Sequence, residues 1–368
     1  MAVSASHTRQ DILTGRQVII AAARDQRPVP LQDEITSAAE QNSADIAAHD
    51  PFLEGQETHT PHERLALRQT NTRANTPGWL VRVVPNRYPA VDQGTRDSDA
   101  PHSHDAGSLI GQHDVVVECA DFLTQLQQLS ITQLTRVLLA WQLRVLQLHA
   151  DGRFPHIRIF RNQGVMAGAS LPHSHSQIVA TALADETAGM PLWRAPLTDS
   201  GENSLFLQWK NAELQAETRL LEASARWLIV CPFASRFSWH TRLCPGPETP
   251  SRFEQLSVSE LSDLAARLKS ICVALPKLAG PVDFNLTLTL PSLGSGSTFP
   301  WMLDILPRPG RIAGFELMTG VHIVTVTPET AAARFRERIV WEQMADPRDG
   351  LSSVDECVTP AGYHWHPA

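Results

Sequence analysis

Cysteine is scarce in this sequence and is not arranged for metal binding or disulfide pairing. The five cysteines are odd in number, scattered along 368 residues, and never spaced as Cys-x-x-Cys. That usage is typical of a reduced intracellular protein and offers no zinc knuckle. The sequence also lacks a basic leader with an apolar core, and it lacks any apolar run of the roughly 18 residues that a membrane span requires. We therefore expect a cytoplasmic protein without a membrane partner.

Positive charge is in deficit as well. Lys and Arg number 31 against 39 Asp and Glu, which gives a formal net charge of -8. Binding to nucleic acid without sequence preference needs a basic face that displaces counterions, so we expect no nucleic-acid partner. Hydrophobic residues make up 42% and charged residues 19%, as in a folded globular protein. A chain of this length exceeds one compact core, which predicts two domains or one large duplicated unit.

Two segments have the apolar spacing of amphipathic helices. In residues 130–149 apolar side chains recur at helical spacing, and Ser130 with Gln133 is expected to form a capping box. A second helix is predicted to begin at Ser257, where Glu260 completes the same capping pattern. The two helices open with nearly the same phrase, LSITQL in the first and LSVSEL in the second.

This phrase is one of three landmarks that recur in the same order along the chain. HDVVVE at His113 is matched by HTRLCP at His240, and Pro172 is matched by Pro300, at a nearly constant offset along the sequence. Three ordered matches indicate an ancient internal duplication. Strands with one capped helix in each half, without regular strand-helix-strand crossovers, favour an α+β fold with antiparallel sheets and flanking helices.

The stretch AGASLPHSHSQIVA contains the most distinctive pattern of polar residues. His173, His175 and Gln177 occupy alternate positions, so in an extended strand they share one face and the intervening serines face the other way. HIRIF, which begins at His156, is predicted to be a neighbouring strand. The preceding loop, RNQGVMAGAS, contains two glycines that let backbone amides approach an anion closely. A phosphate beside an imidazole follows from this pattern.

Spacing alone leaves three interpretations of the two histidines open. A neutral imidazole is a capable nucleophile, and its attack on an α-phosphorus gives a reactive phosphoramidate that passes a nucleotidyl group onward. Gln177 could then donate a hydrogen bond to a phosphoryl oxygen. His-x-His on a strand is also good metal-ligand geometry, and paired histidines on a half-exposed sheet can simply be satisfied polar residues.

Several segments in a fixed order resemble one known family. They are VIIAAARDQRP, VVPNRYPAV, GQHDVVVE, FRNQGVMAGASLPHSHSQIVA, CPFASRFSWH and GFELMTGVHIVTVTPETAAARFR, and they span most of the chain. In this order they resemble the galactose-1-phosphate uridylyltransferase family of the histidine-triad superfamily. The sequence also resembles nucleotide-sugar phosphorylases. The chain is therefore expected to consist of two tandem histidine-triad-like domains.

The resemblance implies a ping-pong transfer of a nucleoside monophosphate between a nucleotide sugar and a sugar 1-phosphate, through a nucleotidyl-histidine. Transferred residue by residue, it makes His175 the nucleophile, Gln177 a contact of the transferred phosphoryl group, and His173 the other member of the histidine pair. The remaining implied positions bind phosphate oxygens, the nucleoside or the sugar, and they are Arg24, Arg27, Asn86, Asn162, Gly168, Ser170, Phe315 and Glu316.

The duplication and the resemblance together predict the domain organisation. A catalytic N-terminal domain is expected over residues 1–190, a sugar-side C-terminal domain over 200–345, and a tail over 346–368. Leu303 falls near the place in the second half that His175 holds in the first. The second half is therefore expected to lack a nucleophile.

The sequence departs from the family at its metal positions. The family commonly holds a structural zinc, and the matching positions here are Asp50, Leu53, Phe122 and His173. Leucine and phenylalanine cannot coordinate a metal, so we predict that this zinc is absent and expect no certain cofactor. A second metal site of many members falls on Met302 and Asp304, and it is expected to be lost too.

Two other activities remain open at this point. A nucleotide-sugar phosphorylase, for example one acting on ADP-glucose, uses inorganic phosphate as acceptor, and the sequence chooses neither the acceptor, the base nor the sugar. A catalytically inactive nucleotide-binding homologue is the alternative outside enzymes, which the missing metal ligands keep open. The family often forms homodimers, so a homodimer is a further expectation.

Overall fold

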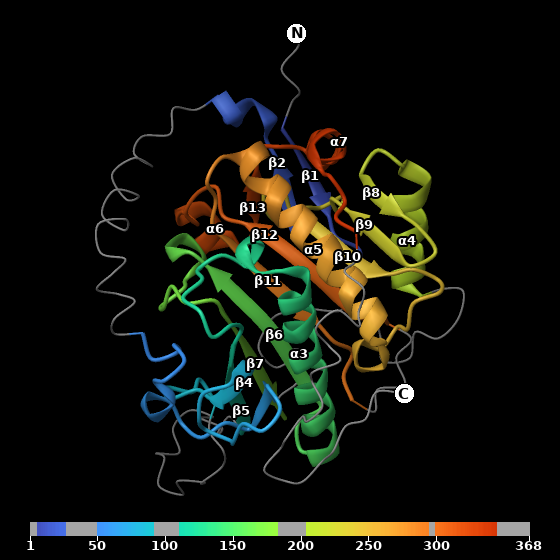
Figure 1. Cartoon of the computed structure of the whole chain (residues 1–368). Coiled ribbons are helices and arrows are strands. Elements are labelled where there is room, and N and C mark those ends of the chain that lie inside the picture. The colour runs from blue at the N-terminus through green and yellow to red at the C-terminus, as the bar shows by residue number, and fades with distance from the viewer. Residues whose placement is uncertain (1–5, 27–49, 92–109, 183–203, 294–298, 344–368) are drawn as a thin grey trace, which may run out of the picture.

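The computed structural model describes residues 6–26, 50–91, 110–182, 204–293 and 299–343 (Figure 1). Ten strands form one antiparallel sheet in the order β3-β4-β5-β7-β6-β11-β12-β10-β9-β8. These strands are β3 (Leu65–Arg68), β4 (Trp79–Pro85), β5 (Gly111–Val117), β6 (His156–Gln163), β7 (His175–Thr181), β8 (Leu220–Ala223), β9 (Trp227–Val230), β10 (Thr241–Pro245), β11 (Phe284–Thr289) and β12 (Met302–Pro307). A small second sheet has the order β1-β2-β13. Its strands are β1 (His7–Gln10), β2 (Gln17–Ile20) and β13 (His322–Val324).

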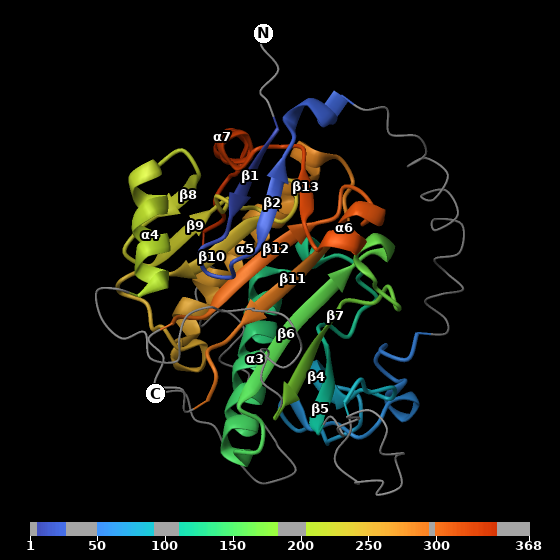
Figure 2. The same ribbon diagram turned by 180° about the vertical axis from the view of Figure 1, so that it is seen from behind.

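Helices α3, α5 and α7 cover one face of the large sheet, and helix α4 and the small sheet lie on the other (Figure 2). The helices are α3 (Ile131–Asp151), α4 (Leu205–Ala216), α5 (Val258–Ala279), α6 (Gly314–Thr319) and α7 (Pro328–Arg338). Helices α3 and α5 cross the front of the sheet in Figure 1, and β1, β2 and β13 lie in front of it in the reverse view of Figure 2. Within the described ranges, no helix is both long and apolar enough to cross a membrane. The predicted α+β class with antiparallel sheets and flanking helices is confirmed.

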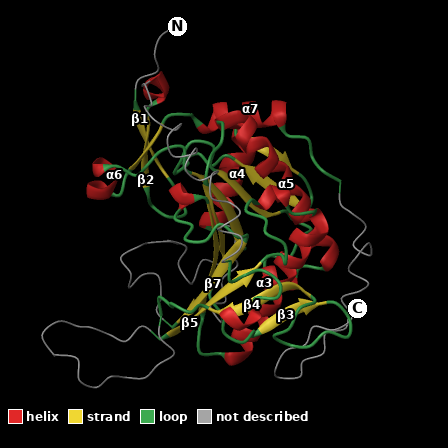
Figure 3. Ribbon diagram, turned by 60° about the vertical axis from the view of Figure 1, so that its left-hand side comes forward, coloured by secondary structure: helices red, strands yellow, loops and turns green. Residues whose placement is uncertain are grey.

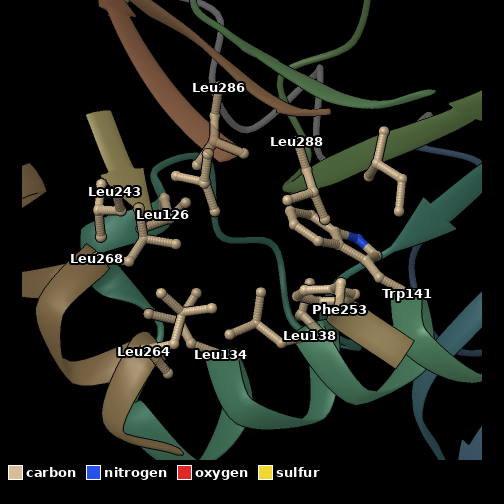
Figure 4. Packing of buried hydrophobic residues seen from close by; sticks show 14 of the residues in the cluster. Leu126, Leu134, Leu138, Trp141, Leu243, Phe253, Leu264, Leu268, Leu286 and Leu288 are labelled. Carbon is tan, nitrogen blue, oxygen red and sulfur yellow. The ribbon is translucent and has the colours of Figure 1, made fainter. Parts of the chain in front are cut away.

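The main core lies between the sheet and helices α3 and α5. The apolar positions predicted for both helices are buried, and they pack with strand residues such as Leu286 and Leu288 (Figure 4). Trp141 of α3 also donates its indole N–H to Ser176 Oγ on β7, 2.8 Å away. This hydrogen bond ties the helix layer to the strand that carries the histidines.

The two predicted helix starts have different caps. Ser257 and Glu260 form the predicted capping box at α5. At α3, Ser130 accepts from the Gln133 N–H as expected, but the capping box is incomplete because the Gln133 side chain donates to the carbonyls of Leu80 and Glu118 instead. Two backbone acceptors of neighbouring segments thus compete successfully with the cap.

The strand order repeats in mirror image about the central pair β6–β11. Reading outward from that pair, β6-β7-β5-β4-β3 has the same order as β11-β12-β10-β9-β8. At the centre Phe160 pairs with Thr287, its counterpart in the second half. Phe160 pairs with Gln177 on the other side, and Thr287 pairs with Asp304, which follows Gln177 at the same offset in sequence. One continuous sheet therefore joins two equivalent halves.

The constant offset corrects one expectation about the second half. Strand β7 begins at His175 and β12 begins at Met302, so the counterpart of His175 is Met302 and not Leu303. A register shift of one residue turns a side chain to the other face of the sheet, which is why the distinction matters. The predicted domain boundary between 190 and 200 and the tail at 346–368 lie outside the described residues.

Candidate active site

Strand β7 carries the histidine pattern in the middle of the first half. It pairs with β5 and, as predicted, with β6. Ser176 accepts from Trp141 on the helix face, and Ser174 donates to Glu118 Oε2 at 2.8 Å. The rings of His173 and His175 both lie beside Phe52, with centroids 6.0 and 5.5 Å away. Strand β7 begins at His175, so the predicted alternation lies on the strand from His175 to Gln177, and His173 and Ser174 directly precede it.

His175 is held in the protonation state that a nucleophile needs. Its Nδ1 lies 2.7 Å from the carbonyl oxygen of His173, and a carbonyl can only accept, so Nδ1 carries the ring proton. Within the described residues Nε2 makes no hydrogen bond, and its lone pair is left for attack. Burial lowers the pKa of His175, since only 6% of the residue is exposed, and the ring stays neutral near pH 7.

The glycine loop between β6 and β7 is shaped by two left-handed residues. Gly164 has φ +84° and Gly168 has φ +85°. A Cβ on Gly164 would collide with the Asp283 carboxylate, which accepts the Met166 N–H at 2.7 Å. Glycine is required at position 164 because of both its conformation and this close approach.

An asparagine pair connects this loop to the central strands. Asn285 of β11 donates from Nδ2 to Asn162 Oδ1 at 2.9 Å and to the carbonyl of Ala167 at 2.7 Å. A Cβ on Gly168 would lie 4.0 Å from Asn162 Nδ2, which places that glycine beside the amide. Asn162 and Gly168, both predicted site residues, therefore lie together, whereas Asn285 was not predicted.

Gln177 and Asn86 meet around a histidine that the sequence did not single out. His113 of β5 has its Nε2 2.7 Å from Gln177 Oε1 and 3.2 Å from Asn86 Nδ2. Asn86 itself follows β4, and its N–H donates to the His113 carbonyl. The structure thus brings Asn86 to Gln177 through His113. The signal that could have found His113 was its match with His240 in the internal duplication.

The other predicted positions make no hydrogen bond to this group within the described residues, or lie outside them. Ser170 and Arg24 are exposed, Arg24 within a short 3-10 helix at Ala22–Gln26, and Arg27 is outside the described residues. Phe315 and Glu316 are on α6, where Glu316 Oε2 accepts the N–H that precedes its own helix and Phe315 is 41% exposed. In Figure 3 α6 projects beside β1 and β2, away from β7. No hydrogen bond among the described residues joins these positions to His175.

A buried hydrogen-bonded pair, His173 with Asp50, occupies the predicted zinc position. His173 Nδ1 lies 2.5 Å from Asp50 Oδ2, and its Nε2 lies 3.0 Å from the Cys119 carbonyl. Both ring nitrogens therefore face acceptors, and neither has a lone pair for a metal. Phe122 stands edge-on to the same ring at 6.0 Å.

The chemistry of the surrounding donors does not fit zinc either. Burial raises the pKa of the Cys119 thiol to about 12, so this side chain is a neutral thiol in the metal-free protein at neutral pH. Leu53 and Phe122 have no ligand atoms, and within the described ranges no three His, Cys, Asp or Glu side chains gather around one point. Structural zinc therefore has no fitting donor set here.

In the second half, a buried methionine occupies the position equivalent to His175, and an aspartate in an ion pair occupies the position equivalent to Gln177. Met302 is fully buried in an apolar cluster with residues such as Trp209. Asp304 accepts from Arg242 Nε at 2.7 Å and from His240 Nε2 at 3.0 Å. Burial by itself would raise the pKa of the Asp304 carboxyl, but Arg242 and His240 hold that pKa far below the ordinary value, so the carboxylate stays ionised. This half has no histidine at the place of His175.

Comparisons with known proteins identify relatives of this chain. The sequence model described as galactose-1-phosphate uridyl transferase, N-terminal domain, matches residues 1–184. The chain is 28% identical over 339 residues to ADP-glucose phosphorylase of Arabidopsis thaliana, covering 89% of this chain and 92% of that protein. It is 25% identical over 348 residues to galactose-1-phosphate uridylyltransferase of Rattus norvegicus, covering 90% and 87%. The crystal structure of an Arabidopsis thaliana ADP-glucose phosphorylase with bound ADP-glucose has the same fold, with a TM-score of 0.71, 24% identity, and coverage of 91% and 100%.

Proposed function

Because the chain belongs to the galactose-1-phosphate uridylyltransferase family and is a nucleotidyltransferase, we propose that it transfers a nucleoside monophosphate from a nucleotide sugar through a covalent adduct on His175. The observation that carries this proposal is the hydrogen bond from His175 Nδ1 to the His173 carbonyl, which leaves Nε2 as the nucleophile.

The reaction has two balanced steps. Nε2 attacks the α-phosphorus, a P–N bond forms, and the bond from that phosphorus to the bridging oxygen breaks, so that the sugar 1-phosphate leaves with the electron pair. A phosphate oxygen of the acceptor then attacks the same phosphorus, and the P–N bond breaks to regenerate neutral His175. During the adduct the ring is positively charged, and its Nδ1–H donates to the His173 carbonyl, which stabilises that charge.

The other residues of the site supply binding and orientation. Gln177 donates its amide N–H to a phosphoryl oxygen, and the loop that ends at Gly168, beside Asn162, approaches the same anion with its backbone. Asn86, which lies beside His113, borders the nucleoside as the family resemblance implies. The family resemblance implies further substrate contacts from Arg24, Arg27, Ser170, Phe315 and Glu316, although no hydrogen bond among the described residues joins any of them to His175.

Two acceptors are candidates. The first is a hexose 1-phosphate, as in the uridylyltransferases that share 25% identity over most of the chain. The second is inorganic phosphate, which is favoured by the 28% identity to ADP-glucose phosphorylase over 89% of this chain. We place the reaction in the reducing environment of the cytoplasm, which suits the four described cysteines, all buried free thiols, and we propose a homodimer as the assembly.

Covalent labelling tests the proposal directly. The full chain is incubated with UDP-glucose or with ADP-glucose and its intact mass is measured. The expected result is a nucleoside-monophosphate adduct that is labile in acid, stable in base and absent from the His175→Gly variant. Discharge of the adduct with galactose 1-phosphate or with inorganic phosphate then identifies the acceptor. Absence of an adduct with every common nucleotide sugar refutes the transferase and favours a binding protein.

A further inference from the structure

His113 has a single tautomer, and a backbone amide determines it. The side chain is buried on β5, and its Nδ1 lies 3.1 Å from the backbone nitrogen of Ala90. A backbone N–H can only donate, so Nδ1 is the acceptor and the ring proton of the neutral imidazole is on Nε2. His113 therefore presents an N–H donor to whatever lies beyond Nε2.

The acceptor of that proton is the amide oxygen of Gln177. Gln177 Oε1 lies 2.7 Å from His113 Nε2, which is a short N–H to oxygen distance. Asn86 Nδ2 lies 3.2 Å from the same Nε2, but Asn86 Oδ1 accepts the Tyr88 N–H at 2.8 Å, so the group that faces His113 is an NH2 donor and makes no hydrogen bond to the Nε2–H. Exchanging the oxygen and nitrogen of the Gln177 amide by a flip would set a second N–H group against His113. The amide is therefore fixed with its oxygen toward His113 and its NH2 group away from it.

The second half contains the same arrangement, which supports the assigned tautomer. His240, the counterpart of His113 in the duplication, accepts the backbone N–H of Arg236 at Nδ1 over 3.2 Å. Its Nε2 lies 3.0 Å from Asp304, the counterpart of Gln177. An ionised carboxylate only accepts, so this Nε2 must carry the proton. Both histidines thus donate from Nε2 to the residue at the same place in each half.

The difference between the halves lies in the residue that receives the hydrogen bond. A carboxylate such as Asp304 has no donor left for a substrate, whereas an amide that accepts through its oxygen keeps two N–H donors on the other side. Gln177 lies two residues after His175 on the same face of β7, and its amide nitrogen has no hydrogen bond to any described residue. The free NH2 group is therefore available to a phosphoryl group on the His175 ring.

We propose that His113 is a positioning residue that locks the Gln177 amide with its NH2 group toward the phosphoryl oxygen of the nucleotidyl group transferred by His175. This inference rests on the proposed function and adds to it a residue that acts through another one. An oriented donor needs no reorganisation during the reaction, whereas an amide free to flip presents its oxygen to the phosphate for part of the time. His113 thus contributes to the rate of the chemical step more than to binding.

A double-mutant cycle tests this dependence. The rate of adduct formation is measured in single turnovers with the nucleotide sugar that labels the full chain. His113→Phe is expected to lower the rate about 10- to 100-fold, as for the loss of one oriented donor. In a Gln177→Ala background the same change is expected to lower the rate by less than about 3-fold, because the group on which His113 acts is gone. His113→Gln, which restores an N–H donor near Nε2, is expected to recover most of the rate.

The matched control is the equivalent histidine of the other half. His240→Phe removes the same kind of hydrogen bond from Asp304 and is expected to lower stability while leaving the rate of adduct formation within about 3-fold of wild type. Thermal unfolding of every variant confirms that the folded protein is compared. Full multiplication of the His113→Phe and Gln177→Ala effects would overturn the inference, as would an unchanged rate in His113→Phe.

A second measurement judges His113 without turnover. Nitrogen-15 shifts of the histidine rings in the full chain distinguish Nε2–H from Nδ1–H, and the signal missing from His113→Gln assigns the residue. An Nδ1–H ring would overturn the inference whatever the activity. An Nε2–H ring in a protein that forms no adduct would leave the orientation of Gln177 standing and refute the proposed function alone.

Discussion

Asp50→Asn is expected to destabilise the protein strongly although it removes no atom from the core. Asp50 and His173 are buried, with side chains 4% and 0% exposed, and they meet at 2.5 Å. The other carboxylate oxygen accepts the Phe52 N–H at 2.9 Å. An asparagine has one oxygen for the two groups that Asp50 faces, so at least one buried hydrogen bond is lost.

The expected loss in the free energy of unfolding is about 2–4 kcal/mol. A hydrogen bond to a charged group contributes roughly 1.5–3 kcal/mol, and removal of one partner of a buried pair costs about 3–5 kcal/mol. Because the His173 carbonyl holds the Nδ1–H of His175, slower adduct formation is expected as well. Replacing both partners, as in Asp50→Leu with His173→Phe, is expected to recover part of the stability, since neither side chain is left facing an apolar replacement, although the Phe52 N–H and the Cys119 carbonyl lose their side-chain partners.

Urea unfolding followed by tryptophan fluorescence measures the effect. Asp151→Asn is the matched control, because Asp151 pairs with the exposed Arg153 and its loss is expected to leave the midpoint essentially unchanged. Prolonged dialysis against a zinc chelator is also expected to leave the wild-type midpoint where it was. Asp50→Asn within about 0.5 kcal/mol of wild type would refute the reasoning, because that is the ordinary scatter of surface changes. A chelator-sensitive midpoint would refute the metal-free pair.

Three further predictions concern the loop, the small sheet and the second half. Gly164→Ala is expected to lower the free energy of unfolding by at least about 1–3 kcal/mol, because residue 164 has φ +84° and the added methyl group would collide with Asp283. An unchanged midpoint of urea unfolding would contradict this. His322 is expected to titrate in NMR near pH 4, since burial and then nearby arginines lower its pKa to about 4. Because its folded pKa is below the ordinary 6.5, stability should fall as pH drops from about 6.5 to 4 and level off above 6.5, and His322→Gln should flatten that slope. Arg242→Met is expected to lower the free energy of unfolding by about 3–5 kcal/mol, because the buried Asp304 carboxylate loses its arginine partner. The rate of adduct formation is expected to stay within about 3-fold of wild type. Loss of labelling in a folded variant would argue against separate roles for the two halves.

The sequence predicted the fold well where interactions between residues close in the sequence determine the local structure. The apolar faces of α3 and α5, the Ser257 cap and the pairing of β6 with β7 follow from periodicity and capping chemistry, which act over a few residues. The duplication was found for the same reason, as matched local phrases. Its register was placed one residue wrong at Leu303, because insertions between landmarks shift a match without changing its appearance.

Partners of individual polar side chains were harder to predict. Gln133 leaves its own helix cap for two distant carbonyls, and Asp50 reaches His173 across 123 residues of sequence. The role of His113 depends on Ala90, Gln177 and their geometry, none of which a spacing rule contains. Such contacts are decided by the tertiary arrangement, where any of several nearby acceptors would satisfy the same donor.

The pairing of β6 with β11 has a consequence for how such a chain could arise. In a single unit before gene duplication, β6 would have been an unpaired edge, and unpaired edges recruit a second strand. Two copies joined along that edge, with Phe160 and Thr287 as descendants of one position, form the sheet now seen in one polypeptide. After the fusion only one copy needed to keep the histidine, and in the other copy Met302 now occupies the position equivalent to His175.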